Sequence, residues 1–352
     1  MPANAVPLPD LRIRVDGRDL QHEVIEDVIA VTTQEDLGAL GMFAIQLYNW
    51  NANTLQFTWS DDDRFRPGAE VEISLGYVDD LQRVMAGEVT SLEPAFQADE
   101  TPQVTVRGFD RGHRLQRGRK TRSFAKLKDS AIAQKVAHEA GLSAKVKDSR
   151  LVHDYVLQHN QSDWSFLTER ADRIGYMLFV RDKELHFAPP ALNRQPVARF
   201  GLDDDVLSFH PRLAIGPQVD QVVVRGWSAW DKKAIQGKAR VGQEGRIGDG
   251  TSGLSRASSA FGSVEGAVVN EPVANKAEAD AMALAQLDDG ALRYVMGELA
   301  CQGQPKVHPG DVVAVDGAGR RFSGNYYVTG VTHIVDMARG YQTRLYLQRS
   351  TA

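Results

Sequence analysis

Hydrophobic and polar residues alternate with a period of two through most of residues 10 to 110. Residues 11–15 alternate in this way, Asp16 and Gly17 supply a hairpin turn, and comparable runs follow at 43–48, 71–75, 87–89 and 104–106. Such alternation is typical of strands with one buried face, because successive side chains point to opposite sides of a sheet. The region is therefore predicted to hold five or more short strands, as in a small barrel or sandwich.

The period changes between about residues 112 and 190. Ser130 is predicted to cap one helix, which ends at Gly141, and Ser162 or Asp163 to begin a second, which ends at Gly175. Their apolar faces would consist of Ile132, Val136 and Ala140 in the first helix and of Trp164, Leu167, Ala171 and Ile174 in the second. Two strand-like runs at 176–180 and 185–187 flank a turn and predict a hairpin. This middle segment is thus expected to be α+β.

Strand-like sequence returns at 222–224 and stops at about residue 236. Residues 237–270 are rich in Gly and Ser with little periodicity, so they predict an extended loop that is mobile or ordered only by a partner. A helix would begin at Asn275, with Glu278 completing its cap. Its apolar side would hold Ala277, Ala281, Leu284 and Leu287. Strand-like sequence resumes at about 298, so the loop and helix interrupt a second β region.

Two short stretches occur twice. PGAEVEI at 67–73 matches PGDVVAV at 309–315, and VTVRGF at 104–109 matches VVVRGW at 222–227. Pro-Gly favours a turn and the residues after it suit a half-buried strand, so each copy predicts the same strand edge built twice. The two echoes occur in opposite order along the chain, which argues against a simple tandem repeat.

The predicted fold class is α+β, mainly β, with two related small β-barrel-like domains, an α+β middle domain and a helical insertion. The first β-barrel-like domain would span residues 1–111 and the middle domain residues 112–210. The second β-barrel-like domain would combine residues 211–236 and 298–352, around a loop and helix insertion at 237–297. Residues 10–110 and the split second segment would share one fold.

Composition sets limits on the function. Of the 352 residues, 42% are hydrophobic and 25% charged, as in soluble globular proteins, and a net charge of −5 argues against general nucleic-acid binding. The single cysteine, Cys301, excludes an internal disulfide and is predicted to lie in a strand or core. The start of the sequence shows no signal-peptide pattern and no run approaches membrane-spanning length, so the chain is expected to be assembled in a cytoplasm without membrane insertion.

No motif for a metal, a cofactor or catalysis stands out, so none is predicted. The nine histidines form no zinc-binding pattern. The Asp runs at 61–63 and 203–205 lack the Gly and distal Glu of an EF-hand loop and are predicted to be solvated turns. Residues 248–253 match GxGxxG, but neither a preceding buried strand nor a helix opening at Gly253 is expected, so a nucleotide site is not predicted.

The strongest charge signal is a basic stretch from residue 107 to 128 that contains one acidic residue, Asp110. Its aromatic residues are limited to Phe109 and Phe124, which weakens a nucleic-acid interpretation. Subunit contact or a solvated surface is favoured instead, because complementary charge commonly guides assembly. The candidate subunit or partner contacts are Arg107, Arg111, Arg114, Arg117, Arg119, Lys120 and Arg122.

Three segments resemble the phage late control protein D family: GFDRGHRLQRGRKTRSF (108–124), LQHNQSDWSFLTERADRIGYMLFV (157–180) and HPGDVVAVDGAGRRFSGNYYVTGVTHIVD (308–336). Proteins of that family are tail hubs of contractile phages and phage-derived injection machines, similar to the N-terminal part of VgrG spikes. The resemblance implies a homotrimer whose two barrel domains per chain give six similar units, joining a sixfold tail tube to a threefold spike. The implied partners are the tail tube protein, a separate spike protein and other baseplate proteins, in a particle assembled in the bacterial cytoplasm.

One departure from VgrG-type chains shapes the functional prediction. Those chains continue into an oligosaccharide-binding-like domain and a β-helical needle, whereas this sequence stops at Ala352, so the spike and any hydrolase are expected to be separate chains. A non-enzymatic baseplate hub is the primary prediction. A baseplate-associated cell-wall hydrolase is the alternative, and a nucleic-acid adaptor that uses the basic stretch is a third. The parent particle could be a phage, a tailocin or a toxin-delivery system.

Overall fold

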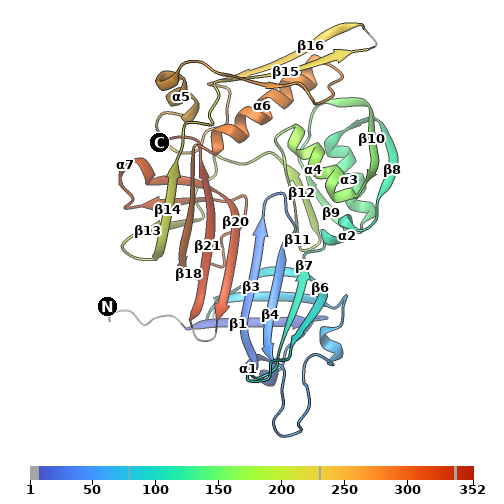
Figure 1. The fold of residues 1–352 in the computed structure, drawn as a ribbon, viewed down its shortest axis with the longest axis vertical. Helices are drawn as coiled ribbons and strands as arrows, with labels where there is room; N and C mark the ends of the chain where they lie inside the picture. Colours follow the sequence, from blue (N-terminus) through green and yellow to red (C-terminus); the bar gives the residue numbers. More distant parts are fainter. Residues whose placement is uncertain (1–7, 79, 230, 337–338) are drawn as a thin grey trace.

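The computed structural model describes residues 8–78, 80–229, 231–336 and 339–352. A 13-stranded sheet contains strands from both ends of the sequence, and three smaller sheets with helices complete the molecule (Figure 1). The predicted mainly β, α+β class is confirmed. The expectation that the sequence begins without a signal peptide rests partly on residues 1–7, which lie outside the described residues.

The first β unit is formed by the N-terminal strands. They are β1 (Pro9–Val15), β2 (Arg18–Asp19), β3 (Val28–Asp36), β4 (Met42–Tyr48), β5 (Glu70–Tyr77), β6 (Asp80–Ala95) and β7 (Gln103–Phe109). Two short helices, α1 (His22–Glu26) and η1 (Asp63–Phe65), lie between them. The strand order is β3-β4-β7-β6-β5-β1-β2. Alternate residues such as Ile13, Phe43 and Val106 are buried in one core, as the period of two predicts.

The second β unit is formed mainly by C-terminal strands. They are β13 (Ala198–Gly201), β14 (Val206–Leu213), β18 (Val295–Gln302), β19 (Val312–Asp316), β20 (Gly324–Asp336) and β21 (Gly340–Arg349), with α7 (Gly319–Phe322) before β20. Strand β20 also pairs with β3, from Gly330 opposite Asp36 to Asp336 opposite Ala30. The two units therefore share one layer, in which β14, β18, β21, β20, β3, β4, β7 and β6 follow one another (Figure 1).

The two β units have the same strand order. In the first unit the path is β3-β4-β7-β6-β5-β1, and in the second it is β14-β18-β21-β20-β19-β13. The six strands of each path also follow one another in the same order along the chain. One pairing differs, since β1 runs antiparallel to β5 whereas β13 runs parallel to β19.

The two Pro-Gly turns occupy equivalent positions. Gly68 and Gly310 have φ angles of 90° and 92°, which a residue with a side chain adopts only with strain. The Gly68 amide donates to the carbonyl of Val89 (2.7 Å), and the Gly310 amide donates to the carbonyl of Val328 (2.8 Å). Directly after these two valines, β6 and β20 both shift register against their next strand. The prediction that both turns precede equivalent strands is confirmed.

The second echo has no structural counterpart. VTVRGF is β7, whereas VVVRGW lies in β15 (Gln221–Ser228), in a separate sheet with β16 (Lys233–Arg240) and β17 (Glu265–Val268). Runs of β-branched residues suit many strands, so this match reflects strand propensity alone. The apparent reversal of order disappears with it, and the equivalent strands follow one another in tandem.

Strand pairing also departs from the predicted ranges. Strands β13 and β14, at 198–213, were placed largely in the middle domain, yet they pair with β19 and β18 of the second unit. Val206, Phe209 and Leu213 pack against its core, which explains the pairing of β14. Residues 221–228 and 233–236, assigned to the second barrel, lie in the sheet of β15 and β16 instead.

The middle segment is α+β, with its own core. It contains α2 (His113–Gln116), β8 (Lys120–Lys128), α3 (Asp129–Glu139), β9 (Ser143–Val146), β10 (Val152–Gln161), α4 (Asp163–Arg173), β11 (Met177–Arg181) and β12 (Glu184–Ala188). Ser162 caps α4 by accepting the Ser165 amide (3.1 Å), and Trp164 and Leu167 are buried as predicted. Ser130 is not the cap of α3, because that helix already begins at Asp129 and Ser130 lies inside it.

The prediction of an extended loop at 237–270 was wrong, because the segment contains a helix and residues of two strands. It contains the end of β16, then α5 (Gly253–Phe261) and β17. Helix α5 does begin at Gly253, capped by Ser252, contrary to expectation. A Cβ at Gly253 would lie 2.4 Å from the Tyr294 ring, so close packing accounts for this glycine. No βαβ unit surrounds the GxGxxG motif, because the preceding strand β16 is antiparallel to β15.

Helix α6 (Lys276–Leu292) begins at Asn275, whose side chain accepts the Glu278 amide (3.0 Å), as predicted. The predicted apolar side is only partly correct, since Leu287 is buried but Leu284 is exposed and Ala277 faces outward. The buried side consists of Ala279, Met282, Ala283, Leu287 and Ala291. Strand β16 approaches this side closely, because a Cβ at Gly237 would lie 2.1 Å from the Ala279 backbone.

Candidate functional site

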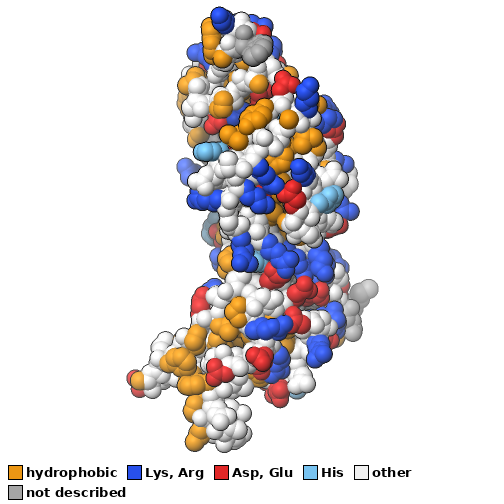
Figure 2. Space-filling view, turned by 90° about the vertical axis from the view of Figure 1, so that its right-hand side faces the viewer, with side chains coloured by type: hydrophobic (Ala, Val, Ile, Leu, Met, Phe, Trp, Pro, Cys, Tyr) orange, Lys and Arg blue, Asp and Glu red, His pale blue; other side chains and the backbone are white. Residues whose placement is uncertain are grey.

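The basic stretch does not form one surface, because most of its charges are paired within the chain. Arg111 is buried and bridges Glu70 (3.0 Å) and Asp182 (2.7 Å). Arg114 pairs with the buried carboxylate of Glu88. Figure 2 shows basic and acidic side chains interleaved across the waist of the molecule.

The remaining candidates are divided between ion pairs and solvent. Exposed Arg107 pairs with Glu93 (2.8 Å). Lys120 and Arg122 both contact Asp163, at 2.6 and 2.8 Å. The Arg119 guanidinium donates to the Asn160 carbonyl (3.0 Å). Arg117 is exposed. Within the described residues, Arg117 and Arg119 are therefore the members of the set without a carboxylate partner.

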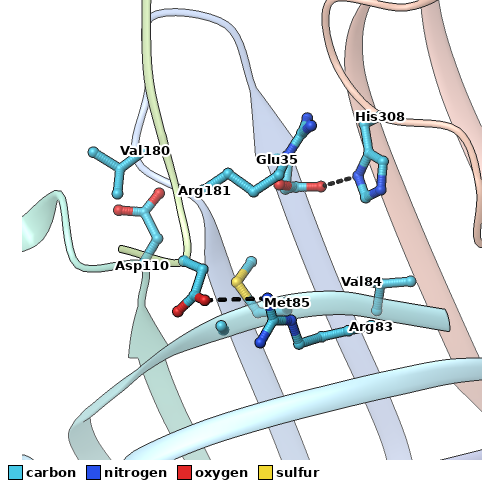
Figure 3. Close-up of a pocket in the computed structure, with 10 residues that line it drawn as sticks. Glu35, Arg83, Val84, Met85, Asp110, Val180, Arg181 and His308 are labelled. Atoms are coloured by element: carbon cyan, nitrogen blue, oxygen red, sulfur yellow. Dashed lines mark hydrogen bonds and ion pairs between the residues drawn. The ribbon is translucent and has the colours of Figure 1, made fainter. Parts of the chain in front are cut away.

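A polar junction lies where the two β units meet the middle segment (Figure 3). Nδ1 of His308 lies 3.0 Å from the carboxylate of Glu35 on β3. Arg83 on β6 donates to Asp182 in the turn between β11 and β12 (3.1 Å). These residues surround a cavity of about 70 Å³. The junction thus fastens three parts of the chain to one another through charged groups.

Asp110 is the most deeply buried carboxylate of this junction. Its oxygens accept the amides of Gly41 (2.5 Å) and Gly112 (2.7 Å). Burial raises the pKa of Asp110 to about 7, and the two amides offset that effect only in part. A Cβ at Gly41 would lie 2.9 Å from this carboxylate, so a side chain there would displace Asp110 from its present position.

A second buried network joins the middle segment to α6. Asp129 contacts His153 (2.9 Å) and Arg170 (2.6 Å). Burial raises the pKa of Asp129, but these two partners outweigh burial and hold the pKa below its usual value. Arg173 of α4 pairs with Glu278 of α6 (3.1 Å). The network thus links the middle segment to α6 through charged groups.

Sequence reasoning found Arg111 but missed the residues around it. Glu35, Asp182 and His308 lie far apart in the sequence, and only the tertiary structure brings them together. The described residues contain no cluster of three or more His, Cys, Asp or Glu side chains suited to a metal ion. Nor does any helix in the described ranges have the length and apolar character needed to cross a bilayer. Cys301 is fully buried, and burial raises the pKa of its thiol to about 12.

Two strand edges are open at the ends of the shared layer. Within the described residues, β14 pairs with β18 alone, and residues 91–95 of β6 pair with β7 alone. Phe96 follows β6 and is 59% exposed. It contacts Phe57 (centroids 4.8 Å apart), which contacts Trp50 (5.5 Å). Figure 2 shows exposed hydrophobic side chains gathered at this lower end of the molecule.

Comparison with known proteins places the chain in a family. Residues 6–336 match the model of the Alg8 N-terminal domain, so the chain belongs to that family. No curated protein matches the sequence. Among solved structures, it is similar to a 43 kDa tail protein of prophage MuSo2 from Shewanella oneidensis, with 15% identity, 97% of this chain and 98% of that chain covered, and a TM-score of 0.72.

Two further structures have the same fold. A tail protein from Neisseria meningitidis shares 15% identity, with 97% of each chain covered and a TM-score of 0.72. An Escherichia coli protein described as a component of the type VI secretion system shares 12% identity over 96% of this chain and 77% of that one, with a TM-score of 0.59. The fold is therefore that of phage and type VI secretion tail proteins.

Proposed function

We propose that this chain is the structural hub of a phage-like contractile tail or injection system, a trimeric adaptor that joins the sixfold tail tube to the threefold spike. The observation that carries the proposal is the doubled strand order within one chain. Two units with the same six-strand path stand side by side, joined by the pairing of β3 with β20. Three copies would supply six similar units, which suits a sixfold partner on one side and a threefold partner on the other.

The open edges support a closed ring of such units. The pairing of β3 with β20 covers one edge of each unit, and β14 and β6 keep the other edges open at opposite ends of the shared layer. A contact between two different surfaces of one chain generates a ring when its rotation closes. A lone chain would leave these edges exposed, which natural sheets generally avoid.

The finer assignments follow from this role. The chain is proposed to be related to late control protein D proteins, to contact a tail tube protein, a separate spike protein and other baseplate proteins, and to be assembled in the bacterial cytoplasm. Arg117 and Arg119 remain candidates for partner contact, because neither is neutralised by a carboxylate in the described structure. A non-enzymatic role is favoured, since no specific observation on the described residues supports the hydrolase alternative.

Sedimentation of the purified chain tests the proposal. Over a concentration series, a species with the mass of three chains is expected, and a tube protein added in excess should co-sediment with it. Arg117→Glu with Arg119→Glu is the matched variant for docking, because both side chains are exposed and their reversal leaves the core untouched. A single-chain mass at every concentration would contradict the hub assignment.

A further inference from the structure

The pairing of β3 with β20 joins the two β units within the chain, and it indicates how the corresponding strands of two copies would pair. Val89 and Val328 are equivalent, because each accepts the amide of a Pro-Gly turn and each precedes a register shift. Residues 91–97, at the end of β6 and beyond, therefore correspond to residues 330–336 of β20. Residues 330–336 pair with β3. Residues 91–95 pair with β7 alone, so the edge that corresponds to the β3-paired edge of β20 is open.

The partner strand can be aligned in the same way. Strand β3 shifts register against β4 between Val28 and Ala30, and β14 shifts against β18 between Val206 and Ser208. Residues 30–36 of β3 therefore correspond to residues 208–214. The same irregularity in both strands makes this alignment unambiguous, because a slip of one residue would reverse every side chain.

We propose that β14 of one copy pairs antiparallel with residues 91–97 of the next copy, repeating the junction that β3 and β20 form within the chain. The inference rests on the proposed hub function and specifies its chain-to-chain surface. Transferring the register of β3 and β20 places Arg212 opposite Glu93, with Leu213 opposite Leu92 and Phe209 opposite Phe96.

Buried and exposed side chains support this register. Val335 is 4% exposed. Although its strand, β20, belongs to the second β unit, its side chain packs in the core of the first β unit. Phe96 stands at the equivalent position and is 59% exposed. In the proposed junction Phe96 would enter the core of the neighbour's second β unit, where Phe209 and Leu213 are only partly buried. Burial of a Phe side chain stabilises by roughly 1.5–3 kcal/mol.

On the opposite face of the proposed strand pair, the side chains of the two copies carry opposite charges. Glu93 and Arg212 are both exposed and would stand directly opposite each other. Arg107 of β7 already contacts Glu93 (2.8 Å) and holds its carboxylate on this face. Opposite charges across a strand pair stabilise it, whereas like charges weaken it. Arg107, one of the basic residues predicted to contact a neighbour, therefore lies beside the proposed surface.

Two prolines explain why the open edges do not attract unrelated strands. The Ala214 amide donates to the Tyr294 carbonyl, so the backbone groups of even-numbered residues point toward β18. Those of odd-numbered residues of β14 therefore point to the open edge, where Pro211 has no N–H to donate. In the proposed register Pro94 lies opposite it, so the central pair contributes no backbone bond. Prolines on an edge discourage unspecific pairing. Specificity would come from the flanking apolar pairs and from Glu93 with Arg212.

A disulfide across this pair tests the surface. Glu93→Cys and Arg212→Cys are combined in one chain, at a non-hydrogen-bonded pair where Cα atoms lie about 4.5 Å apart, within reach of a disulfide. Mild oxidation should convert most of the protein into a covalent three-chain band that reductant reverses. The matched control combines Glu93→Cys with Arg225→Cys, since Arg225 is exposed on β15 and should give no three-chain band.

Sedimentation of the same double variant separates the two proposals. Three chains that sediment together but never cross-link at this pair would overturn the surface and leave the hub function standing. A chain that sediments alone, with the wild type doing the same, would overturn the hub function itself. Cross-linking in both the test and control pairs would also overturn the surface, because it would show collision without a defined register.

Discussion

Val335 and Phe96 occupy the same position in two copies of one strand arrangement, yet their surroundings differ. Val335 is enclosed by the first β unit of its own chain, whereas Phe96 is 59% exposed beside Phe57. The difference does not arise from the strands themselves, which share order, Pro-Gly turn and register shift. The β3–β20 pairing encloses Val335 within the chain, and in the proposed assembly the edge beside Phe96 would be completed by a second copy.

The largest expected effect separates these two positions directly. Val335→Asp places a carboxylate in a closed core and should lower the free energy of unfolding by several kcal/mol. Phe96→Asp should leave the melting temperature of the single chain nearly unchanged while abolishing the three-chain species. Thermal melts and sedimentation of both variants measure this. Equal destabilisation by the two substitutions would show that Phe96 is part of an internal core.

The next contrast lies within the basic stretch. Arg111→Ala removes a buried guanidinium that bridges Glu70 and Asp182 and should cost about 1.5–3 kcal/mol, the usual range for hydrogen bonds to charged groups, since Asp182 keeps Arg83 as a partner at 3.1 Å. Arg117→Glu should change stability by less than about 0.5 kcal/mol, as exposed substitutions usually do. Chemical denaturation compares the two. A large loss for Arg117→Glu would place that residue in the folded core of the chain.

A smaller effect should depend on pH. Burial raises the pKa of Asp110 to about 7, so its contribution to stability is present while it is protonated and is lost as pH rises from about 4 to about 7. The free energy of unfolding of Asp110→Asn, relative to that of the wild type, should therefore increase as pH rises over that range, by at most a few kcal/mol. Denaturation of both proteins at pH 4.5, 6 and 7.5 gives this difference. A constant difference across the series would mean that Asp110 does not titrate there.

The smallest effect concerns the two turns. Gly68→Ala and Gly310→Ala both introduce a side chain at a φ near +90°, and each should cost about 1 kcal/mol. A Cβ at Gly68 would meet no atom within 4 Å, and at Gly310 only the Tyr327 hydroxyl at 3.9 Å. Backbone strain alone should thus set the cost, and the two melts should shift alike. Clearly unequal shifts would weaken the equivalence of the turns.

Local patterns predicted the elements better than their partners. The period of two found the strands around Ile13 and Val106, and the Ser162 cap and Gly175 marked helix α4. The Pro-Gly echo identified the duplication. The second echo did not indicate equivalent positions, because VVVRGW favours a strand but does not determine which strands will pair with it. Helix α5 was missed because its apolar face is short, with Leu254 and Ala257 buried.

The candidate site was predicted only in part for the same reason. A run of arginines shows that charge is present, but not which acids will reach it. Glu88 and Asp182 neutralise Arg114 and Arg111 from segments that the sequence keeps apart. The open edges of β6 and β14 could not be predicted from the sequence either, because an edge is recognised only once the pairing of all strands in the sheet is known.

The rotational symmetry of the purified assembly tests the central claim most directly. Electron cryomicroscopy of the isolated protein measures it from end-on views, without cross-links or partners. A closed ring of three identical chains, with six similar β units around it and β14 of each chain against β6 of the next, is the predicted result. Particles that contain a single elongated chain, or two chains related by a twofold axis, would contradict the account.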